Sequence, residues 1–184
     1  MPMKIELVTS NQNKVKEFEL VLEPEIIVDH TKHEYVEIQS NDPIEVAKES
    51  AQRVANEMGR PIVVEDSGLF IDVLNGFPGT LSKYVHQKIG LKGILKLLEH
   101  EPNRLAAYRS VVAYCEPKRD AEIFLGEERG TIAVAIKGTF GFGHDPIFIP
   151  EGSAQTYGEM EDASHRKKFR KRAIQQLKDF LLMK

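Results

Sequence analysis

The sequence feature that most constrains the fold is the apolar run at residues 61–64, Pro-Ile-Val-Val, which leads directly into Glu65-Asp66-Ser67-Gly68. Short apolar runs rich in β-branched residues are typical of buried strands. Because Asp, Ser and Gly favour turns, we expect a strand over residues 62–65, a turn at 66–68 and a second strand over 69–73. Strands joined so closely are antiparallel neighbours, so this pattern excludes a purely parallel sheet.

Strands and helices alternate over the first third of the chain. We expect strands over residues 4–8 and 25–29, with a helix over residues 14–22 between them. The next helix has the clearest limits. Asp42 is a cap residue, Pro43 takes the first helical position, Glu45 follows at the capping-box position, and Gly59 ends a helix over residues 43–58.

The second half of the chain predicts further β structure. Helical patterns at residues 82–89 and 91–100 flank Gly90, and residues 105–136 read as an antiparallel meander. Apolar residues then recur at helical spacing over residues 164–183. We therefore expect an α/β fold of the mixed α+β kind, with a partly antiparallel mixed sheet flanked by helices, in one domain over residues 1–184.

Composition excludes several classes of protein. The net charge of -3 gives no reason to expect nucleic-acid binding, and no apolar run approaches the roughly 20 residues of a membrane helix. The single cysteine, Cys115, lies in an apolar run, which indicates a buried thiol and fits a reducing cytoplasm. Basic residues crowd positions 166–172, and spacing alone favours a solvated helix face for most of them.

The polar loop after the first strand is a candidate phosphate site. Thr9, Ser10, Asn11, Gln12 and Asn13 lead into the predicted helix, where backbone N–H groups and the helix dipole attract anions, and Lys14 adds a positive charge. The loop has no glycines, so it is not a Walker A loop. An ordinary strand–helix loop with a capping side chain remains the alternative.

Two acidic residues are candidates for metal-assisted chemistry. Successive side chains on a strand point to opposite faces, so Glu65 is a poor metal partner for Asp66. Asp66 could act as a general base or metal ligand, and Ser67 could donate to a phosphate oxygen. Glu37 would complete a pair of carboxylates suited to a hard cation, although a surface charge and a plain Asp-Ser-Gly turn are the alternatives.

Two further motifs could recognise a base. Residues 140–148 combine stacking rings, close-approach glycines, an imidazole and a carboxylate, which are the parts of a base-binding loop, although aromatic core packing would use the same residues. Ser164-His165-Arg166 supplies hydrogen-bond donors at a helix start, or simply a capped and solvated helix end.

Taken in order, five motifs resemble those of the Ham1 family of inosine triphosphate pyrophosphatases. They span nearly the whole chain: Thr9-Ser10-Asn11 with Lys14, Glu65 to Leu69, Gly76-Phe77-Pro78-Gly79, Gly141 to Phe148, and Ser164-His165-Arg166. The resemblance implies an elongated mixed sheet in two lobes with a central cleft, as in Maf and Ham1 proteins, and a homodimer. It also implies Mg²⁺-dependent cleavage of ITP, dITP or XTP to the monophosphate and pyrophosphate.

The resemblance also implies residue roles. Asp66 would be the base and, with Glu37, a magnesium ligand, while Ser67 would contact the substrate. The phosphates would be held by Thr9, Ser10, Asn11 and Lys14 with the backbone at Gln12 and Asn13. The purine would be bound by Phe142, Gly143, His144, Asp145, His165 and Arg166, with Phe142 stacking on the ring and Asp145, His165 and Arg166 reading its edge.

The chain departs from the family pattern in two places. His144 stands where the family usually has tyrosine or tryptophan, and no lysine precedes Ser164 in the short acidic segment 159–163. The family commonly has a lysine shortly before its serine-histidine-arginine triplet. In this chain the substrate contact of that lysine is either absent or supplied by Lys167 or Lys168. A Maf-type pyrophosphatase with other base specificity and a non-catalytic nucleotide- or RNA-binding module are the competing functions.

Overall fold

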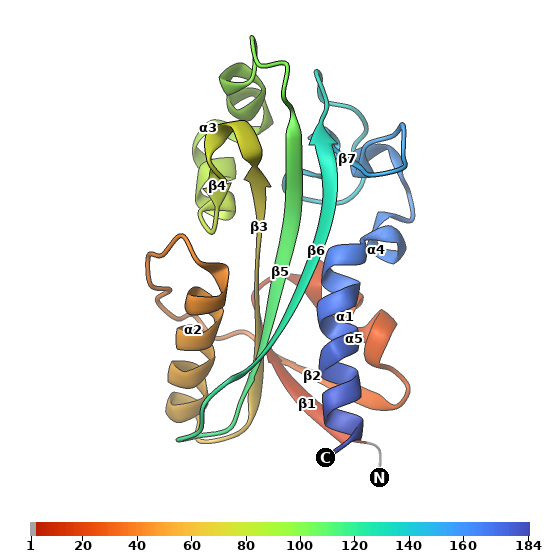
Figure 1. Cartoon of the computed structure of the whole chain (residues 1–184). Helices are drawn as coiled ribbons and strands as arrows, with labels where there is room; N and C mark the ends of the chain where they lie inside the picture. The colour runs from red at the N-terminus through yellow and green to blue at the C-terminus, as the bar shows by residue number, and fades with distance from the viewer. Residues whose placement is uncertain (1–2) are drawn as a thin grey trace. The chain divides into compact units, whose positions relative to one another are not determined.

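A computed structural model of the chain describes residues 3–184. Over these residues the strands form one seven-stranded mixed sheet in the order β2-β1-β3-β5-β6-β7, with β4 paired to β3 beside this path (Figure 1). The strands are β1 (Met3–Val8), β2 (Ile26–Thr31), β3 (Ile62–Ile71), β4 (Pro78–Gly79), β5 (Leu105–Cys115), β6 (Glu122–Ile132) and β7 (Phe148–Pro150). The pairs of β1 with β2 and β3 are parallel, and β3–β4 and β6–β7 are antiparallel. The predicted mixed sheet flanked by helices is confirmed.

Five α-helices and three short 3₁₀ helices lie between or after the strands in the described part of the chain. The α-helices are α1 (Gln12–Leu22), α2 (Pro43–Met58), α3 (Ser82–Leu97), α4 (Ala163–Arg166) and α5 (Lys168–Leu182). The 3₁₀ helices are η1 (Asp72–Leu74), η2 (Asp145–Ile147) and η3 (Tyr157–Glu159). No helix within residues 3–184 is long and apolar enough to cross a membrane.

The chain divides into two compact units. Unit 1 comprises the chain up to Asp66 together with Ser110–Gly126 and Lys168–Lys184, and unit 2 comprises Ser67–Arg109 and Glu127–Lys167. Three sheet strands, β3, β5 and β6, therefore contribute residues to both units. The boundary in β3 falls between Asp66 and Ser67, inside the polar motif of that strand.

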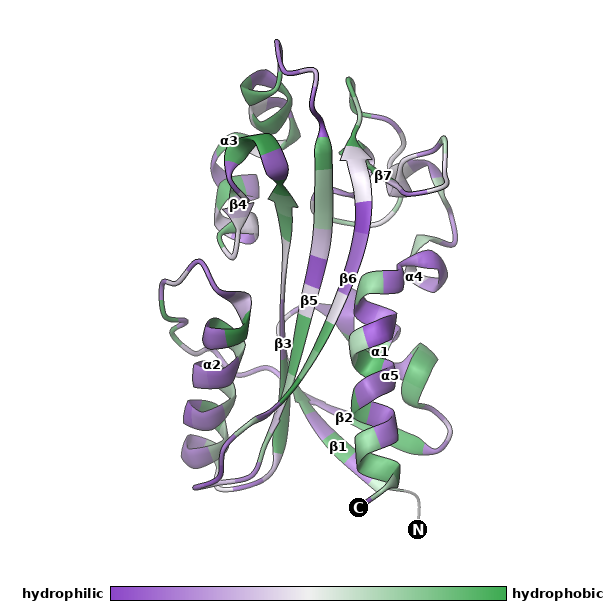
Figure 2. Ribbon diagram, in the orientation of Figure 1, coloured by the Kyte–Doolittle hydropathy of each residue, from purple (hydrophilic) through white to green (hydrophobic). Residues whose placement is uncertain are grey.

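The core of unit 1 has helices on both faces of its strands. Val63 and Val112 pack with α1 and α5, whereas Val64 and Val111 pack with α2. Neighbouring strand residues thus face opposite helix layers, as the alternation of side chains requires. Figure 2 shows that α2 and α5 each carry hydrophilic and hydrophobic residues, which is the pattern of helices that cover a sheet on one side only. Cys115 lies buried in the α2 layer, as predicted.

Helix α2 begins and ends where the sequence predicts. The Asp42 carboxylate accepts a hydrogen bond from the Ile44 N–H at 2.9 Å, and Gly59 ends the helix with φ of 64°. Glu45 closes the cap indirectly. Its carboxylate accepts from the Ser40 hydroxyl at 2.6 Å, and that hydroxyl accepts from the Asp42 N–H at 3.1 Å.

The predicted turn at residues 66–68 is wrong, because β3 runs without interruption from Ile62 to Ile71. Gly68 does not reverse the chain there; it lets the neighbouring strand β4 approach. A Cβ on Gly68 would lie 2.1 Å from the Gly79 carbonyl oxygen. The Ser82 hydroxyl completes this contact, donating to Gly79 O at 2.6 Å and accepting from the Leu69 N–H at 2.8 Å.

Replacing Gly68 by alanine is expected to destabilise the fold by about 1–3 kcal/mol, the usual cost of overpacking. The new methyl group would meet a backbone oxygen, which cannot move aside as a flexible side chain would. Chemical denaturation measures this cost. A loss below about 0.5 kcal/mol in Gly68→Ala would contradict the close approach at Gly68.

Two other predicted elements differ from the structure. Strand β6 ends at Ile132, so residues 133–136 do not continue it. The predicted terminal helix is interrupted at Lys167, which separates α4 from α5. The two helical patterns around Gly90 form α3, with Gly90 itself in a non-helical conformation at φ of 61° and ψ of -167°.

Candidate functional site

The loop after β1 is ordered by its own polar side chains. Asn11 caps α1 by accepting from the Asn13 N–H at 3.0 Å, and the Thr9 hydroxyl accepts from the Asn11 N–H at 3.1 Å. Because α1 starts at Gln12, Gln12, Asn13 and Lys14 lie in its first turn, and Ser10 is exposed. The positive end of the helix dipole therefore lies at the predicted phosphate-binding residues.

A residue that the sequence did not indicate supports this loop. His30, on β2, has Nε2 at 2.7 Å from the Thr9 carbonyl oxygen and Nδ1 at 3.5 Å from Gln12 Nε2. One tautomer satisfies both contacts: Nε2–H donates to Thr9, and Nδ1 accepts from Gln12. No motif signalled His30, because only the pairing of β2 with β1 brings it beside the loop.

Lys14 is held by a buried network centred on Glu65. Its ammonium lies 2.6 Å from Glu65 Oε2 and donates to the Glu65 carbonyl at 2.9 Å. Glu65 Oε1 accepts from the Ser110 hydroxyl at 2.5 Å and from Arg170 Nε at 3.0 Å, and Arg170 also pairs with Glu17. Although burial by itself raises the pKa of Glu65, Arg170 and Lys14 outweigh it and hold that pKa at about 2. Glu65 is therefore ionised and committed to these partners.

Asp66 and Ser67 are the half-buried positions of a strand whose other residues are all buried. Glu65 lies on the face of Val63 toward α1 and α5, where Lys14 and Arg170 meet it. In an uninterrupted strand the next residue points to the other face, so Asp66 is expected on the side of Val64. The strand thus presents one carboxylate to a salt-bridge network and the next to a more accessible side.

Glu37 lies exposed in the irregular segment between β2 and α2. The pKa of Tyr35 responds to this carboxylate. Burial raises that pKa, and the charges of Glu37, Asp66 and Glu65 raise it further. Glu37 and Asp66 therefore act on a common phenol. Residues 3–184 hold no group of three or more metal-ligating side chains. A pair of carboxylates nevertheless fits Mg²⁺, which is often held by one or two carboxylates with waters and substrate oxygens.

In unit 2, Asp145 organises the loop at residues 140–148, which is rich in glycine and aromatic residues. Its Oδ2 accepts from the Phe142 N–H at 2.7 Å and lies 2.8 Å from Lys167 Nζ, and its Oδ1 accepts from the Tyr108 hydroxyl at 3.3 Å. Gly141 makes the turn possible, because its φ is 73° and a Cβ there would lie 2.1 Å from Asp145 Oδ2. Phe142 and Gly143 are half-buried, whereas Asp145 is only 2% exposed.

His144 packs against a second histidine. Its ring makes a T-shaped contact with His86 of α3, with centroids 5.1 Å apart. Burial lowers the pKa of His144 to about 4, with a further contribution from His86, so its imidazole is neutral at pH 7. Within residues 3–184, His144 Nε2 and His86 Nδ1 are buried without a hydrogen-bond partner.

Lys167 is one of the two residues that could supply the contact of the lysine missing before Ser164. Its side chain is 2% exposed, and its ammonium lies 3.9 Å from the centroid of the Phe142 ring. Lys168, the other candidate, is exposed. His165 and Arg166 are also exposed on α4, where Arg166 Nε donates to the Asp162 carboxylate at 2.7 Å. The structure thus gathers Lys167, Asp145 and Phe142, and leaves His165 and Arg166 at the surface.

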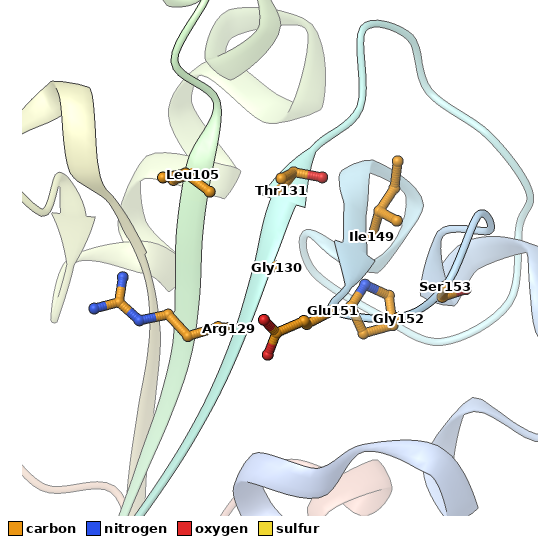
Figure 3. Close-up of a pocket in the computed structure, with 9 residues that line it drawn as sticks. Leu105, Arg129, Gly130, Thr131, Ile149, Glu151, Gly152 and Ser153 are labelled. Atoms are coloured by element: carbon orange, nitrogen blue, oxygen red, sulfur yellow. The ribbon is translucent and has the colours of Figure 1, made fainter.

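A surface pocket of about 310 Å³ also lies in unit 2, beside β6 and β7 (Figure 3). Its lining comprises Leu105, Arg129, Gly130, Thr131, Ile149, Pro150, Glu151, Gly152 and Ser153. The Arg129 guanidinium is already paired with Asp72 and Glu127, each at 3.3 Å. This pocket contains none of the predicted substrate-binding residues.

Comparison with known proteins gives a consistent result. The model of the Ham1 family matches residues 5–180. A dITP/XTP pyrophosphatase of Methanopyrus kandleri is 48% identical over 86% of this chain and 85% of its own, and one from Thermococcus kodakarensis is 42% identical over 97% of both. Solved Ham1 proteins from Coxiella burnetii and Staphylococcus aureus share 27% and 25% identity with the chain, at TM-scores of 0.86 and 0.84. The match to the Coxiella burnetii protein covers 99% of this chain and 100% of that protein, and the match to the Staphylococcus aureus protein covers 98% of both chains. A family match over nearly the whole chain, with relatives this similar, establishes that the chain belongs to the Ham1 family.

Proposed function

We propose that this chain hydrolyses non-canonical purine nucleoside triphosphates, namely dITP, ITP and XTP, to the nucleoside monophosphate and pyrophosphate. The relatives named dITP/XTP pyrophosphatase support this reaction and its substrate class. The observation that carries the proposal is the contrast between two neighbouring carboxylates. Glu65 is buried and pairs with Lys14 beside the loop after β1, whereas Asp66 is half-buried.

Residues of unit 1 would bind the triphosphate. The hydroxyls of Thr9 and Ser10, the Asn11 amide and the N–H groups of Gln12 and Asn13 are donors at the start of α1, and Lys14 contributes a positive charge. The salt bridge with Glu65 limits the conformations of the Lys14 side chain. Lys14 would therefore meet the phosphate with less loss of conformational entropy than a free surface lysine.

Asp66 would accept a proton from the water that attacks the α-phosphorus. A new bond forms between the water oxygen and this phosphorus, the bond from the α-phosphorus to the bridging oxygen of the β-phosphate breaks, and pyrophosphate leaves. Asp66 and Glu37 would hold Mg²⁺, which when bound neutralises charge on the phosphate oxygens.

Residues of unit 2 would bind the base. Phe142 supplies a half-buried ring for stacking, Gly143 allows close approach, and Ser67 and His144 supply groups that form hydrogen bonds. His165 and Arg166 would donate to the oxygen at purine position 6, which adenine replaces with an amino group. Donors left unpaired by adenine would weaken its binding. The resemblance further suggests a homodimer and a cytoplasmic location.

Release of pyrophosphate from ITP, dITP, XTP, GTP, ATP, dTTP and UTP, measured with Mg²⁺ and with excess chelator, tests this function. We expect rapid release from the first three substrates, at least about 10²-fold lower kcat/KM for ATP, and loss of activity without the metal. Preference for dTTP or UTP would indicate Maf-type specificity. Orthophosphate as the product would contradict the cleavage site, and equal rates on GTP and ITP would contradict the substrate class.

A further inference from the structure

Lys167 is a buried cation next to the candidate base-binding ring. Its side chain and that of Asp145 are each 2% exposed, and the two charged groups lie 2.8 Å apart. Removing an ammonium and a carboxylate from water costs several kcal/mol per ion, so a buried pair is weak evidence for a role in stability alone. Both residues of this pair contact Phe142, which indicates a role in the function of the loop that carries it.

Asp145 is already saturated with donors from three parts of unit 2. Phe142 N–H comes from the loop, the Tyr108 hydroxyl from β5, and the Lys167 ammonium from the link between α4 and α5. A carboxylate with this many internal donors has little remaining capacity to read a base. Its bond to Phe142 N–H instead fixes the backbone that carries the ring.

Lys167 contacts the side chain of Phe142, whereas Asp145 contacts its backbone. With its ammonium 3.9 Å from the ring centroid, it lies within the range of a cation–π contact and faces the π-system of Phe142. A cation–π contact depends on the plane of the ring, so the Lys167 ammonium favours one orientation of the Phe142 side chain.

We propose that Lys167 is a positioning residue that, together with Asp145, holds the Phe142 ring in the orientation in which it stacks on the purine. Asp145 fixes the Phe142 backbone and the Lys167 ammonium, and Lys167 fixes the plane of the ring. This inference rests on the proposed function, because it requires a purine ligand. It assigns Asp145 to the support of the loop in place of the base edge.

A double-mutant cycle between Lys167 and Phe142 tests the inference. Lys167→Met and Phe142→Leu are made singly and together, and affinity for inosine monophosphate is measured by calorimetry beside KM and kcat for ITP. We expect Lys167→Met to weaken binding of the monophosphate and raise KM by roughly 5–30-fold, with kcat changed by less than about 3-fold. In the Phe142→Leu background the same change is expected to alter affinity by less than about 2-fold.

Further variants separate positioning from general support of the fold. Lys167→Arg keeps a cation that stacks on aromatic rings and is expected to restore most of the affinity. If Lys167→Met does not fold, Asp145→Asn combined with Lys167→Met removes both charges and keeps an oxygen that accepts from Phe142 N–H. This double variant then replaces Lys167→Met in the double-mutant cycle with Phe142→Leu. Lys171→Met, at an exposed position of α5, is the matched control and should bind normally.

The outcomes distinguish the inference from the function beneath it. Equal losses of affinity in the presence and absence of the Phe142 ring would overturn the positioning role and indicate direct contact or a general structural effect. Wild-type affinity in Lys167→Met would overturn it as well. A wild-type protein that neither binds inosine monophosphate nor hydrolyses ITP would refute the proposed function, and the inference with it.

Discussion

Replacing Asp66 by asparagine is expected to lower pyrophosphate release from ITP by about 10²–10⁴-fold, the usual contribution of a general base. Asparagine matches the shape of aspartate but cannot accept the proton of the attacking water at neutral pH. The fold should survive, because Asp66 is half-buried and lies at one of two such positions in an otherwise buried strand. Steady-state kinetics and thermal unfolding of the same preparation measure both effects.

Asp29→Asn is the matched control for Asp66→Asn. Asp29 is on β2, and its carboxylate is 52% exposed and pairs with Lys4 at 3.4 Å. Removing this charge changes the net charge of unit 1 equally, so its kinetic effect reports general electrostatics alone. Activity at the wild-type rate in Asp66→Asn would remove Asp66 from the chemistry. A large and equal loss in both variants would attribute the effect to net charge.

Replacing Arg170 by methionine is expected to lower the free energy of unfolding by about 3–5 kcal/mol, the cost of breaking a buried charge network from one side. Arg170 is 1% exposed and pairs with both Glu17 and Glu65. Methionine would fill part of the space but would leave two buried carboxylates without their shared cation. Urea denaturation at neutral pH measures the change.

Lys171→Met is the control for replacing a basic residue of α5 by methionine. Because Lys171 is exposed, this substitution should lower the free energy of unfolding by less than about 0.5 kcal/mol. A third variant combines Arg170→Met with Glu17→Gln and Glu65→Gln. It should recover part of the lost stability, since neutral groups are less costly to bury than unpaired charges. A loss below about 1 kcal/mol in Arg170→Met would contradict the importance of this network.

The same network sets part of the response to acid. Arg170 and Lys14 hold the pKa of Glu65 at about 2, below its ordinary value of 4.5, so folding favours the ionised form. The stabilisation from this group is complete above the unfolded pKa and is lost as pH falls from about 4.5 toward 2. In Arg170→Met this part of the acid dependence should shrink, because the partner that depresses the pKa of Glu65 most strongly is absent.

Local patterns predicted the parts of the fold that depend on neighbours in the chain. The limits of α2 follow from Asp42, Pro43 and Gly59, whose backbone preferences operate within one helical turn. The opposite faces of Glu65 and Asp66 follow from strand geometry. Five motifs in order also indicated the Ham1 family, which the family match confirms.

Features that depend on distant residues could not be predicted this way. Asp66-Ser67-Gly68 has the composition of a turn, but Gly68 serves the approach of Gly79, a residue eleven positions later in the chain. A glycine required for a turn and a glycine required for close packing look the same in a sequence. The error at β3 therefore came from assigning a local cause to a tertiary contact.

The sequence by itself determined which chemical groups this protein carries and the order in which they occur, from the loop at Thr9 to the basic segment after Ser164. Only the tertiary structure decided which of those groups are buried together. Lys167 and Arg170 stand among exposed Lys and Arg residues, yet each is buried because carboxylates far away in the chain meet it. Burial of a charge depends on such long-range partners, and a run of basic residues contains no record of them.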